Sequence, residues 1–429
     1  MVFYTTYTVW YTKQDGFWIM AKFLPFHGLL PRPENAAAVS AVPYDVVNTQ
    51  EAAALAAGNP LSFLHVSRPE IDLEPGIDLH DERVYAQAGA AFRRLCAEAP
   101  LTLDKGLHLY LYRLVMNGRA QTGVIGAASA EEYRLGVIKR HEKTRADKED
   151  DRTRHVMELR SHTGPAFFTY RDNAAIDALV ADECRKAPLF DFTSVDGIRH
   201  TVWRLDEATS KKLSALFETQ VPVFYIADGH HRSAAAARTA AECAPKNPNH
   251  TGKEDYNFFL AVAFPATQLA IMPYNRVVRD LNGRSADEFI AELKKKFTVS
   301  PCSDGTVEKP GEFKFLIAGK WYLAVPLFDI SRRGVVDALD ASWLQAEVLS
   351  PLLGVDDPRT SKKIDFIGGI RGTAELEKLV KSGEYAIAFS LHAVTLDQLM
   401  AIADAGEIMP PKSTWFEPKL RDGLVSHNF

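Results

Sequence analysis

The sequence predicts a mixed α/β (α+β) protein, and three observations support that prediction. An apolar run from Val221 leads through a tight turn into an alanine-rich helix that reaches Ala240. A second segment, 137–170, places a charged helix between two apolar strands. Asn117-Gly118 and Gly319-Lys320 each separate two apolar runs, a pattern typical of β-hairpins. At 429 residues, the chain is long enough for two or three domains.

The first predicted domain is an α/β domain covering residues 20–130. Asn59-Pro60 is expected to end its first helix, and Asn117-Gly118 favours a type I′ hairpin turn. Its expected elements are a short strand with proline-rich loops (23–47), a helix (49–57), a strand from Ser62 (SFLHVSRPE), an amphipathic helix (80–97) and a hairpin (107–128).

Two further domains are expected, over residues 131–284 and 285–429. The middle domain is expected to contain strands at 165–170, 197–204, 221–227, 256–264 and 268–278, with helices at 176–186, 210–219 and 233–240. The last domain is expected to contain helices at 285–297, 335–353 and 395–405, a hairpin at 313–327, a strand at 385–392 and a tail that packs near the functional site.

Residues 1–19 are expected to be an N-terminal extension. They are rich in aromatic residues and lack both a basic region and a small-residue cleavage site, so they make a poor signal peptide. Met20 then opens AKFLPFHGLLP, a more usual start. We therefore expect translation to begin at Met20, which the intact mass of the native protein would test.

Composition excludes several classes of protein. The net charge of −5 gives no general attraction to nucleic acid or to acidic membranes. The four cysteines are far apart and form no CxxC pair, which favours a reducing cytoplasm and gives no zinc framework. No apolar run reaches transmembrane length. The expected partner is a small-molecule substrate, and the oligomeric state is left open.

The turn Asp228-Gly229-His230-His231-Arg232 is the main candidate site. Gly229 permits a sharp turn out of the strand, and Asp228 is expected to cap the helix that follows. Two imidazoles and a guanidinium then stand at a helix start, where free N–H groups and the helix dipole favour an anion. The sequence therefore predicts a phosphate or carboxylate site, against the alternative that the turn is only structural.

The charged segment after Val137 is the second candidate. Lys148, Arg152 and His155 fall near one face of a helix, while Glu149 and Asp150 can reach a metal or a partner cation. A helix bracketed by core strands can line a cleft. The alternative is a solvated helix with i,i+4 ion pairs, the commonest use of such runs.

Other motifs are missing or partial. The sequence has no Walker A loop, no HExxH and no Gly-x-Ser-x-Gly elbow, and the glycines of 368–372 form only a partial dinucleotide signature. The cationic helix start and the charged segment are what remain.

From about Phe23 to Leu424 the sequence resembles the DUF1015 family of uncharacterised proteins. The resemblance lies in long words that occur in one order: PYDVV, NPLSFLHVSRPEID, HEKTRADKEDDR, YIADGHHRSAAA, YNRVVRDLNG, DPRTSKKIDFIGGIRG and MPPKSTWFEPKLRDGL. Residues 1–19 lie outside it.

A more distant resemblance concerns residues 131–284. The segment KRHE, followed later by strand–DGHHR–helix, is similar to the ParB/sulfiredoxin-like fold, and within it to the free-serine kinases, which share DGHHR. That resemblance implies a ParB-like central domain flanked by α/β domains. It also implies that Glu142 draws the proton from a serine hydroxyl and that nucleotide phosphates are held by Gly229, His230, His231 and Arg232.

These features lead us to expect a cytoplasmic kinase that moves a phosphoryl group from ATP, ADP or pyrophosphate to free L-serine. Phosphoryl transfer needs positioning and charge neutralisation more than covalent chemistry. Mg²⁺ is expected to bridge phosphate oxygens with few protein ligands. The expected residues are Glu142, His231 and Asp228 as the catalytic groups, Asp228, Asp150 or Asp151 as the metal ligand, Arg145, Lys148 or Arg152 on the substrate carboxylate, and Lys412, Ser413 and Thr414 closing over the site.

Two other functions are weighed against the kinase. One is a metal-dependent phosphoesterase that uses Asp228, His230, His231 and Glu142 as ligands, although two adjacent histidines rarely bind one ion. The other is a non-catalytic nucleotide-binding regulatory protein. The acidic balance and the lack of a basic recognition helix argue against DNA as its partner.

Overall fold

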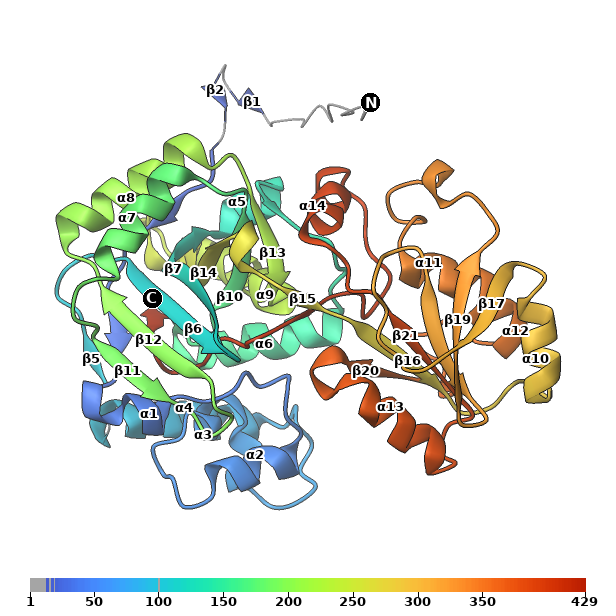
Figure 1. Ribbon diagram of the computed structural model, residues 1–429. Coiled ribbons are helices and arrows are strands. Elements are labelled where there is room, and N and C mark those ends of the chain that lie inside the picture. The colour runs from blue at the N-terminus through green and yellow to red at the C-terminus, as the bar shows by residue number, and fades with distance from the viewer. Residues whose placement is uncertain (1–12, 15–16, 19, 99–100) are drawn as a thin grey trace. The chain divides into compact units, whose positions relative to one another are not determined.

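The computed structural model describes residues 13–14, 17–18, 20–98 and 101–429. The chain forms two compact units, one that includes the described residues up to Leu269 together with Pro418–Phe429, and a second that covers Ala270–Glu417. Both units combine helices and sheets, so the mixed α/β class is confirmed (Figure 1). Most of the expected extension, 1–19, lies outside the described residues.

Unit 1 contains a nine-stranded mixed sheet. Two of its strand pairs are parallel, β10 with β14 and β13 with β8, and the other pairs are antiparallel. In sheet order its strands are β11 (Phe190–Thr193), β12 (Arg199–Arg204), β6 (Tyr110–Met116), β7 (Arg119–Ser129), β14 (Phe258–Pro265), β10 (Ala166–Tyr170), β13 (Phe224–Asp228) and β8 (Ile138–Lys139), with β3 (Phe23–Leu24) beside β7.

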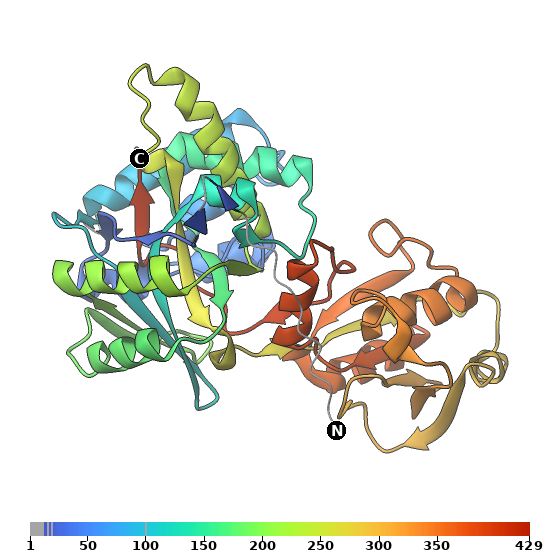
Figure 2. The same ribbon diagram turned by 90° about the horizontal axis from the view of Figure 1, so that it is seen from above.

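A four-stranded sheet brings distant parts of unit 1 together. Its order is β5 (Thr102–Leu103), β4 (Gly28–Leu30), β23 (Ser426–Asn428) and β9 (Ser161–His162). The red strand β23 accordingly lies among blue and green elements when the unit is seen from above (Figure 2). A short strand pair, β1 (Lys13–Gln14) and β2 (Phe17–Trp18), precedes these elements.

The helices of unit 1 fall into two groups. Helices α7 and α8 lie together beside the large sheet, and α1–α4 gather below it in Figure 1. Apolar residues of α5, α7, α8 and α9 share one core with the sheet, while α1–α4 and Leu159 form a second core. The bounds are α1 Ala36–Val39, α2 Thr49–Ala56, α3 Leu64–Ser67, α4 Glu82–Glu98, α5 Ala130–Leu135, α6 Ala146–Leu159, α7 Ala174–Glu183, α8 Glu207–Gln220 and α9 His230–Cys243.

Unit 2 is built on a six-stranded antiparallel sheet. Its order is β17 (Phe297–Cys302), β19 (Lys320–Pro326), β18 (Phe313–Ile317), β21 (Ile387–Leu391), β16 (Tyr274–Val278) and β20 (Ile364–Gly368). The remaining elements are the pair β15 (Ile271–Met272) and β22 (Trp415–Phe416), and the helices α10 (Ala286–Leu293), α11 (Asp340–Leu344), α12 (Ser350–Leu353), α13 (Gly372–Lys381) and α14 (Leu396–Asp404).

The expected domain boundaries can be placed on this architecture. Residues 20–130 and 131–284 both contribute strands to the nine-stranded sheet, so position 130 does not separate two sheets. Position 284 lies inside unit 2, between β16 and α10, and the segment from Pro418 belongs to unit 1. The ParB-like character of the middle region stays a prediction.

Several local predictions are confirmed, and one is wrong. Asn117 and Gly118 have φ of 52° and 77°, as a type I′ turn between β6 and β7 requires. The strand expected from Ser62 is instead the short helix α3. The Ser62 hydroxyl accepts the Leu64 N–H at 3.3 Å, and Pro69 supplies no N–H to a ladder, so local hydrogen bonding favours a helical turn.

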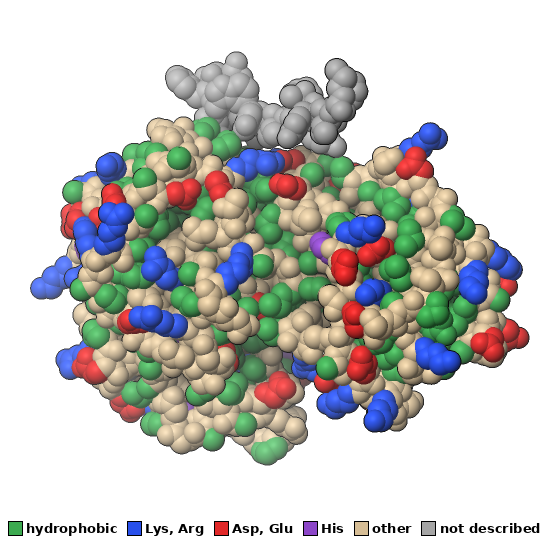
Figure 3. Space-filling model, viewed as in Figure 1, with side chains coloured by type: hydrophobic (Ala, Val, Ile, Leu, Met, Phe, Trp, Pro, Cys, Tyr) green, Lys and Arg blue, Asp and Glu red, His purple; other side chains and the backbone are tan. Residues whose placement is uncertain are grey.

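The surface and the helices agree with the composition. The face in Figure 3 intersperses Lys and Arg with Asp and Glu, in line with the net charge of −5. Within the described ranges, no helix combines the length and apolarity needed to cross a membrane.

Candidate functional site

The turn between β13 and α9 has the strand–turn–helix geometry predicted from the sequence. Gly229 has φ of 87°, a left-handed conformation that glycine adopts without strain. A Cβ at Gly229 would lie 3.3 Å from the Ala166 Cα and 3.0 Å from the Arg232 Nε, so the turn also has no room for a side chain.

Asp228 does not cap α9, which corrects one prediction. Its Oδ1 accepts the N–H of Gly229 at 2.8 Å, one residue away, and Gly229 is the residue that precedes the helix. Gly229, the N-cap residue, has no side chain that could accept the first N–H groups of α9. The carboxylate sits too close to the turn to reach the N–H groups of the first helical turn, which therefore remain available to an anion.

The Asp228 carboxylate is held by two cations. Its Oδ2 lies 3.0 Å from the Lys419 Nζ and 3.8 Å from a guanidinium nitrogen of Arg232. Burial raises the pKa of Asp228, but the positive charges of Lys419 and Arg232 lower it by more, so the pKa of Asp228 lies below its ordinary value. Asp228 is thus ionised at neutral pH, and Lys419 and Arg232 bring positive charge to the helix start.

The two histidines of the turn are neutral rather than cationic. Burial, and then the neighbouring His141, lower the pKa of His230 well below its ordinary value, and the two rings meet edge to face at 4.5 Å. Burial also lowers the pKa of His231, whose Nε2 accepts the backbone N–H of Arg145 at 3.2 Å. The positive charge expected at this helix start therefore does not come from its imidazoles, because burial disfavours the charged form of both rings.

Glu142 is brought to this turn across 88 positions of sequence. Its Oε2 lies 3.9 Å from the Nδ1 of His230, and 48% of its side chain is exposed. The residues around it form an irregular segment between β8 and α6. A partly exposed carboxylate beside a neutral imidazole and a helix start can reach a bound hydroxyl group.

The three cations expected on the substrate carboxylate are placed differently. Arg145 is exposed and pairs with Asp147 at 2.7 Å. Lys148 is half-buried, and its charge contributes to lowering the pKa of His231. Arg152 is largely buried and is the one of the three that lines a cavity.

The carboxylates expected to bind Mg²⁺ do not form a metal site. Asp150 pairs with Arg238 at 2.6 Å, and Asp151 pairs with Arg152 at 2.8 Å. Asp151 also accepts the Tyr85 hydroxyl at 2.9 Å. Because these groups and Asp228 are each neutralised by their own partners, they do not fit a cation. Among the described residues, no cluster of three His, Cys, Asp or Glu side chains is arranged for a metal.

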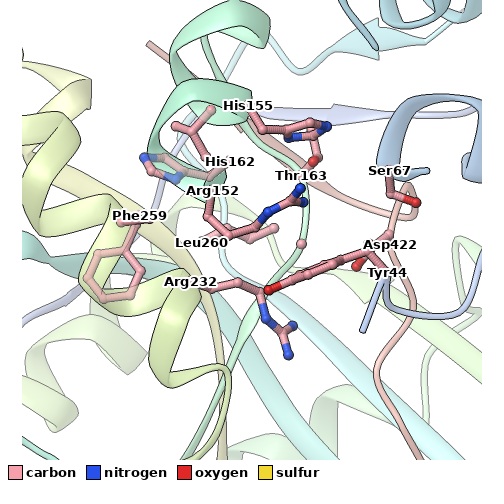
Figure 4. A pocket seen from close by; sticks show the side chains of 13 residues that line it. Tyr44, Ser67, Arg152, His155, His162, Thr163, Arg232, Phe259, Leu260 and Asp422 are labelled. Carbon is pink, nitrogen blue, oxygen red and sulfur yellow. The ribbon is translucent and has the colours of Figure 1, made fainter. Parts of the chain in front are cut away.

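A cavity of about 40 Å³ lies beside the first turns of α9. In Figure 4 the Arg152 guanidinium stands over the Tyr44 ring, with its Cζ 4.0 Å from the ring centroid, and the Tyr44 hydroxyl is directed toward Arg232. Burial is the largest cause of the raised pKa of Tyr44, so its hydroxyl stays protonated. The lining comes from α3, α6, α9, β9, β14 and three loops. Its polar residues are Tyr44, Ser67, Arg152, His155, His162, Thr163, Arg232 and Asp422.

Four residues of this region were not singled out from the sequence: Tyr44, Asp45, Lys419 and Asp422. Asp422 exchanges backbone hydrogen bonds with Ala41, N to O at 2.9 and 3.2 Å, which brings the segment after Pro418 beside Tyr44. Their signal was present in the words PYDVV and KLRD. No local pattern in those two stretches relates them to DGHHR, because they reach the site only through the tertiary pairing of Asp422 with Ala41.

The tail residues expected to close over the site belong to unit 2. Lys412 lies with its Nζ 5.7 Å from the centre of the Tyr274 ring, and the Ser413 hydroxyl donates to the Pro410 carbonyl at 2.8 Å. Closure by Lys412, Ser413 and Thr414 stays a prediction.

The family described as "Protein of unknown function (DUF1015)" matches residues 23–342, and the chain belongs to it. A comparison with curated proteins gives no match.

Similar solved structures include a mutant free serine kinase in complex with AMP, with 15% identity, a TM-score of 0.36, and coverage of 68% of this chain and 86% of that chain. They also include a C-terminally truncated SbnI from Staphylococcus aureus, with 10% identity, a TM-score of 0.37, and coverage of 70% and 85%. A conserved hypothetical protein from Pyrococcus furiosus has 13% identity, a TM-score of 0.33, and coverage of 70% and 93%.

Proposed function

We propose that the protein is a phosphotransferase that moves a phosphoryl group from a nucleotide or pyrophosphate to the hydroxyl of a small metabolite, free L-serine being the expected acceptor. The observation that supports this most is the position of Glu142, whose carboxylate lies 3.9 Å from His230 at the start of α9. A general base and an anion-binding helix start are the two parts that hydroxyl phosphorylation requires.

The helix start provides the phosphate-binding part. The uncapped N–H groups of α9 and the helix dipole favour phosphate oxygens. Lys419 and Arg232 lie 3.0 and 3.8 Å from the Asp228 Oδ2 and bring positive charge to the helix start. Gly229 lets the backbone approach a phosphate closely.

Glu142 provides the base. Its partly exposed carboxylate, beside His230, can accept the proton of an acceptor hydroxyl. His231, held by the Arg145 N–H, is placed to donate its other ring N–H to a phosphate oxygen. Because Asp150, Asp151 and Asp228 are each paired with cationic side chains, Mg²⁺ enters this proposal only as the counter-ion that the phosphate donor brings.

The first experiment offers the purified protein ATP, ADP or pyrophosphate in turn, with Mg²⁺ and L-serine, and detects phosphoserine by mass. We expect Glu142→Gln to reduce turnover roughly 10²- to 10⁴-fold, the range that general-base removal costs, while nucleotide affinity stays nearly unchanged. Glu131→Gln is the matched control, because Glu131 is exposed and pairs with Arg134 on α5. Equal turnover in Glu142→Gln and Glu131→Gln would remove the role assigned to Glu142.

Two other outcomes would redirect the proposal. Nucleotide binding without transfer from any donor would favour a regulatory protein. Hydrolysis of phosphate esters that depends on an added transition metal would favour the phosphoesterase.

A further inference from the structure

The cavity beside α9 is small and carries both signs of charge. Its volume of about 40 Å³ has room for about three water molecules, at roughly 10–15 Å³ each. Arg152, Arg232 and Asp422 all line it. A cavity of this size with two cations and one acid suits a compact group that itself carries both charges.

Several polar atoms in the cavity wall are left without partners. The Ser67 Oγ, the Arg232 Nε and the Asp422 Oδ1 are buried and have no hydrogen-bond partner among the described residues. Asp422 is 3% exposed, so bulk water does not satisfy its carboxyl group. Buried polar atoms are almost always paired, and an unpaired group of them in a cavity wall points to a bound molecule.

The two guanidiniums are fixed in place before any ligand binds. Arg152 pairs with Asp151 at 2.8 Å and lies over the Tyr44 ring. Arg232 donates to the Pro165 carbonyl at 2.5 Å. The N–H groups that these contacts leave over on each guanidinium favour a carboxylate. A ligand with negative charge alone would still face the acid of Asp422.

We propose that this cavity holds the ammonium–carboxylate head group of the amino-acid acceptor, with the carboxylate on Arg152 and Arg232 and the ammonium on Asp422. The inference rests on the proposed function for the acceptor's hydroxyl, and it deepens that function by assigning the head group. It selects Arg152 from the three cations that the sequence left open, and it adds Asp422, which the sequence analysis did not single out.

Binding of the head group should be coupled to a change in the protonation of Asp422. Burial is the largest cause that raises the pKa of Asp422 to about 7, and Arg232 and Arg152 oppose it. An ammonium group beside this carboxyl would favour its ionised form, so binding at pH 7 releases a proton, whereas a simple oxyanion would favour proton uptake. The titratable and charged groups around Asp422 are Arg232, Asp45, Arg152, Arg421, Tyr44, Tyr112, His155 and His162.

Gly164 offers a way to block the cavity without changing a charge. A Cβ at this position would lie 3.1 Å from the Asp422 Oδ1 and 3.5 Å from the Arg232 Cδ. Gly164 does not have a positive φ, so alanine fits its backbone conformation. The added methyl group would contact both Asp422 and Arg232, which the head group is proposed to bridge.

The test is calorimetric binding of L-serine and of glycerate to the full-length protein at pH 7, in buffers that differ in ionisation enthalpy. Glycerate carries a hydroxyl where serine carries the ammonium. We expect wild-type protein to prefer serine and to release a proton with serine only. Asp422→Asn should lose that proton release and most of the preference, and Arg152→Met should weaken both ligands roughly 10- to 100-fold.

Gly164→Ala should also weaken the binding of both serine and glycerate. Arg238→Ala is the matched control and should leave both affinities unchanged, because Arg238 is on α9 but does not line the cavity. Unchanged serine affinity in Gly164→Ala, or an undiminished preference for serine in Asp422→Asn, would overturn the proposal. So would proton uptake with serine, or no binding of serine by the wild type. Serine binding with these properties but without phosphoryl transfer would contradict only the proposed function.

Discussion

Each unit buries an arginine near an aspartate in a cavity, and the two pairs differ in how their hydrogen bonds are satisfied. In unit 2 the guanidinium of Arg276 donates to the carbonyls of Tyr274 and Lys412, and Asp340 accepts the Gly311 N–H at 3.0 Å. Neither side chain leaves a buried atom unpaired among the described residues. In unit 1, Arg232 and Asp422 each leave one.

The electrostatic surroundings of the two arginines also differ. Burial lowers the pKa of Arg276 to about 10, whereas the acids Asp45, Asp228 and Asp422 outweigh burial at Arg232 and raise its pKa. The cavity volumes are about 10 Å³ in unit 2 and about 40 Å³ in unit 1. A buried charged group whose hydrogen bonds are all satisfied within the protein has a structural role. A buried charged group with an unpaired hydrogen-bonding atom in a larger cavity is suited to binding a ligand.

The largest expected effect separates the two arginines by function. Arg232→Ala should reduce both turnover and L-serine affinity, turnover by roughly 10²- to 10³-fold, as expected for loss of a charge-stabilising donor. Arg276→Met should leave both within about twofold but lower the free energy of unfolding by about 1–3 kcal/mol, because buried carbonyls lose their donors. Steady-state kinetics and urea unfolding of both variants measure this. An equal loss of serine affinity in Arg276→Met would contradict the assignment of a ligand-binding role to Arg232 and a structural role to Arg276.

The second prediction compares the two aspartates through pH. Burial raises the pKa of Asp422 to about 7 and that of Asp340 to about 6. A carboxyl group with a raised pKa binds its proton more tightly in the folded state, so its contribution to stability is largest below about pH 4 and is lost as pH rises. Relative to wild type, Asp422→Asn should therefore gain stability between about pH 4 and pH 7, by up to about 4 kcal/mol for a shift of about 3 pH units.

For Asp340→Asn a smaller gain, about 3 kcal/mol for a shift of about 2 pH units, should be complete by about pH 6. Saturating L-serine should shrink the difference between Asp422→Asn and wild type, because the ammonium stabilises the ionised acid, and should leave the Asp340→Asn difference unchanged. Thermal unfolding across this pH range, with and without serine, provides the measurement. A serine effect on both variants alike would contradict the assignment of the cavity in unit 1.

The smallest expected effect concerns two glycines of unit 1 that share a left-handed backbone. Gly229 has φ of 87° and Gly58 has φ of 72°, so alanine should cost about 1–2 kcal/mol of stability at either position. At Gly58 nothing lies within 4 Å of the added Cβ, whereas at Gly229 the Arg232 side chain lies at 3.0 Å. Only Gly229→Ala should therefore also weaken nucleotide binding. Equal nucleotide affinities in the two variants would show that the position of Arg232 tolerates the added methyl group.

The sequence predicted the turn and the helix of the site because both are local. Gly229 between an apolar strand and an alanine-rich run leaves few alternatives, and the structure confirms that turn. It also led to Glu142, whose approach to His230 the structure shows. It failed on the charge of His230 and on the capping role of Asp228, because burial and the direction of a short side chain depend on tertiary packing.

Asp422 and Lys419 illustrate what local patterns cannot provide. Nearly 200 positions separate them from Asp228 and Arg232, and β23 is the element that returns this part of the chain to unit 1. Periodicity and turn chemistry report neighbours in sequence, and the pairing of β23 with β4 and β9 leaves no signature in any one segment.

That return has a consequence for how the protein is made. Unit 1 begins to emerge from the ribosome first, but Lys419 and Asp422 follow all of Ala270–Glu417 in synthesis. A nascent chain that ends before them can form most of the large sheet and the helix start, with Asp228 and Arg232 already present and two of their charged neighbours still missing. Completion of the site therefore follows the synthesis of the residues of unit 2.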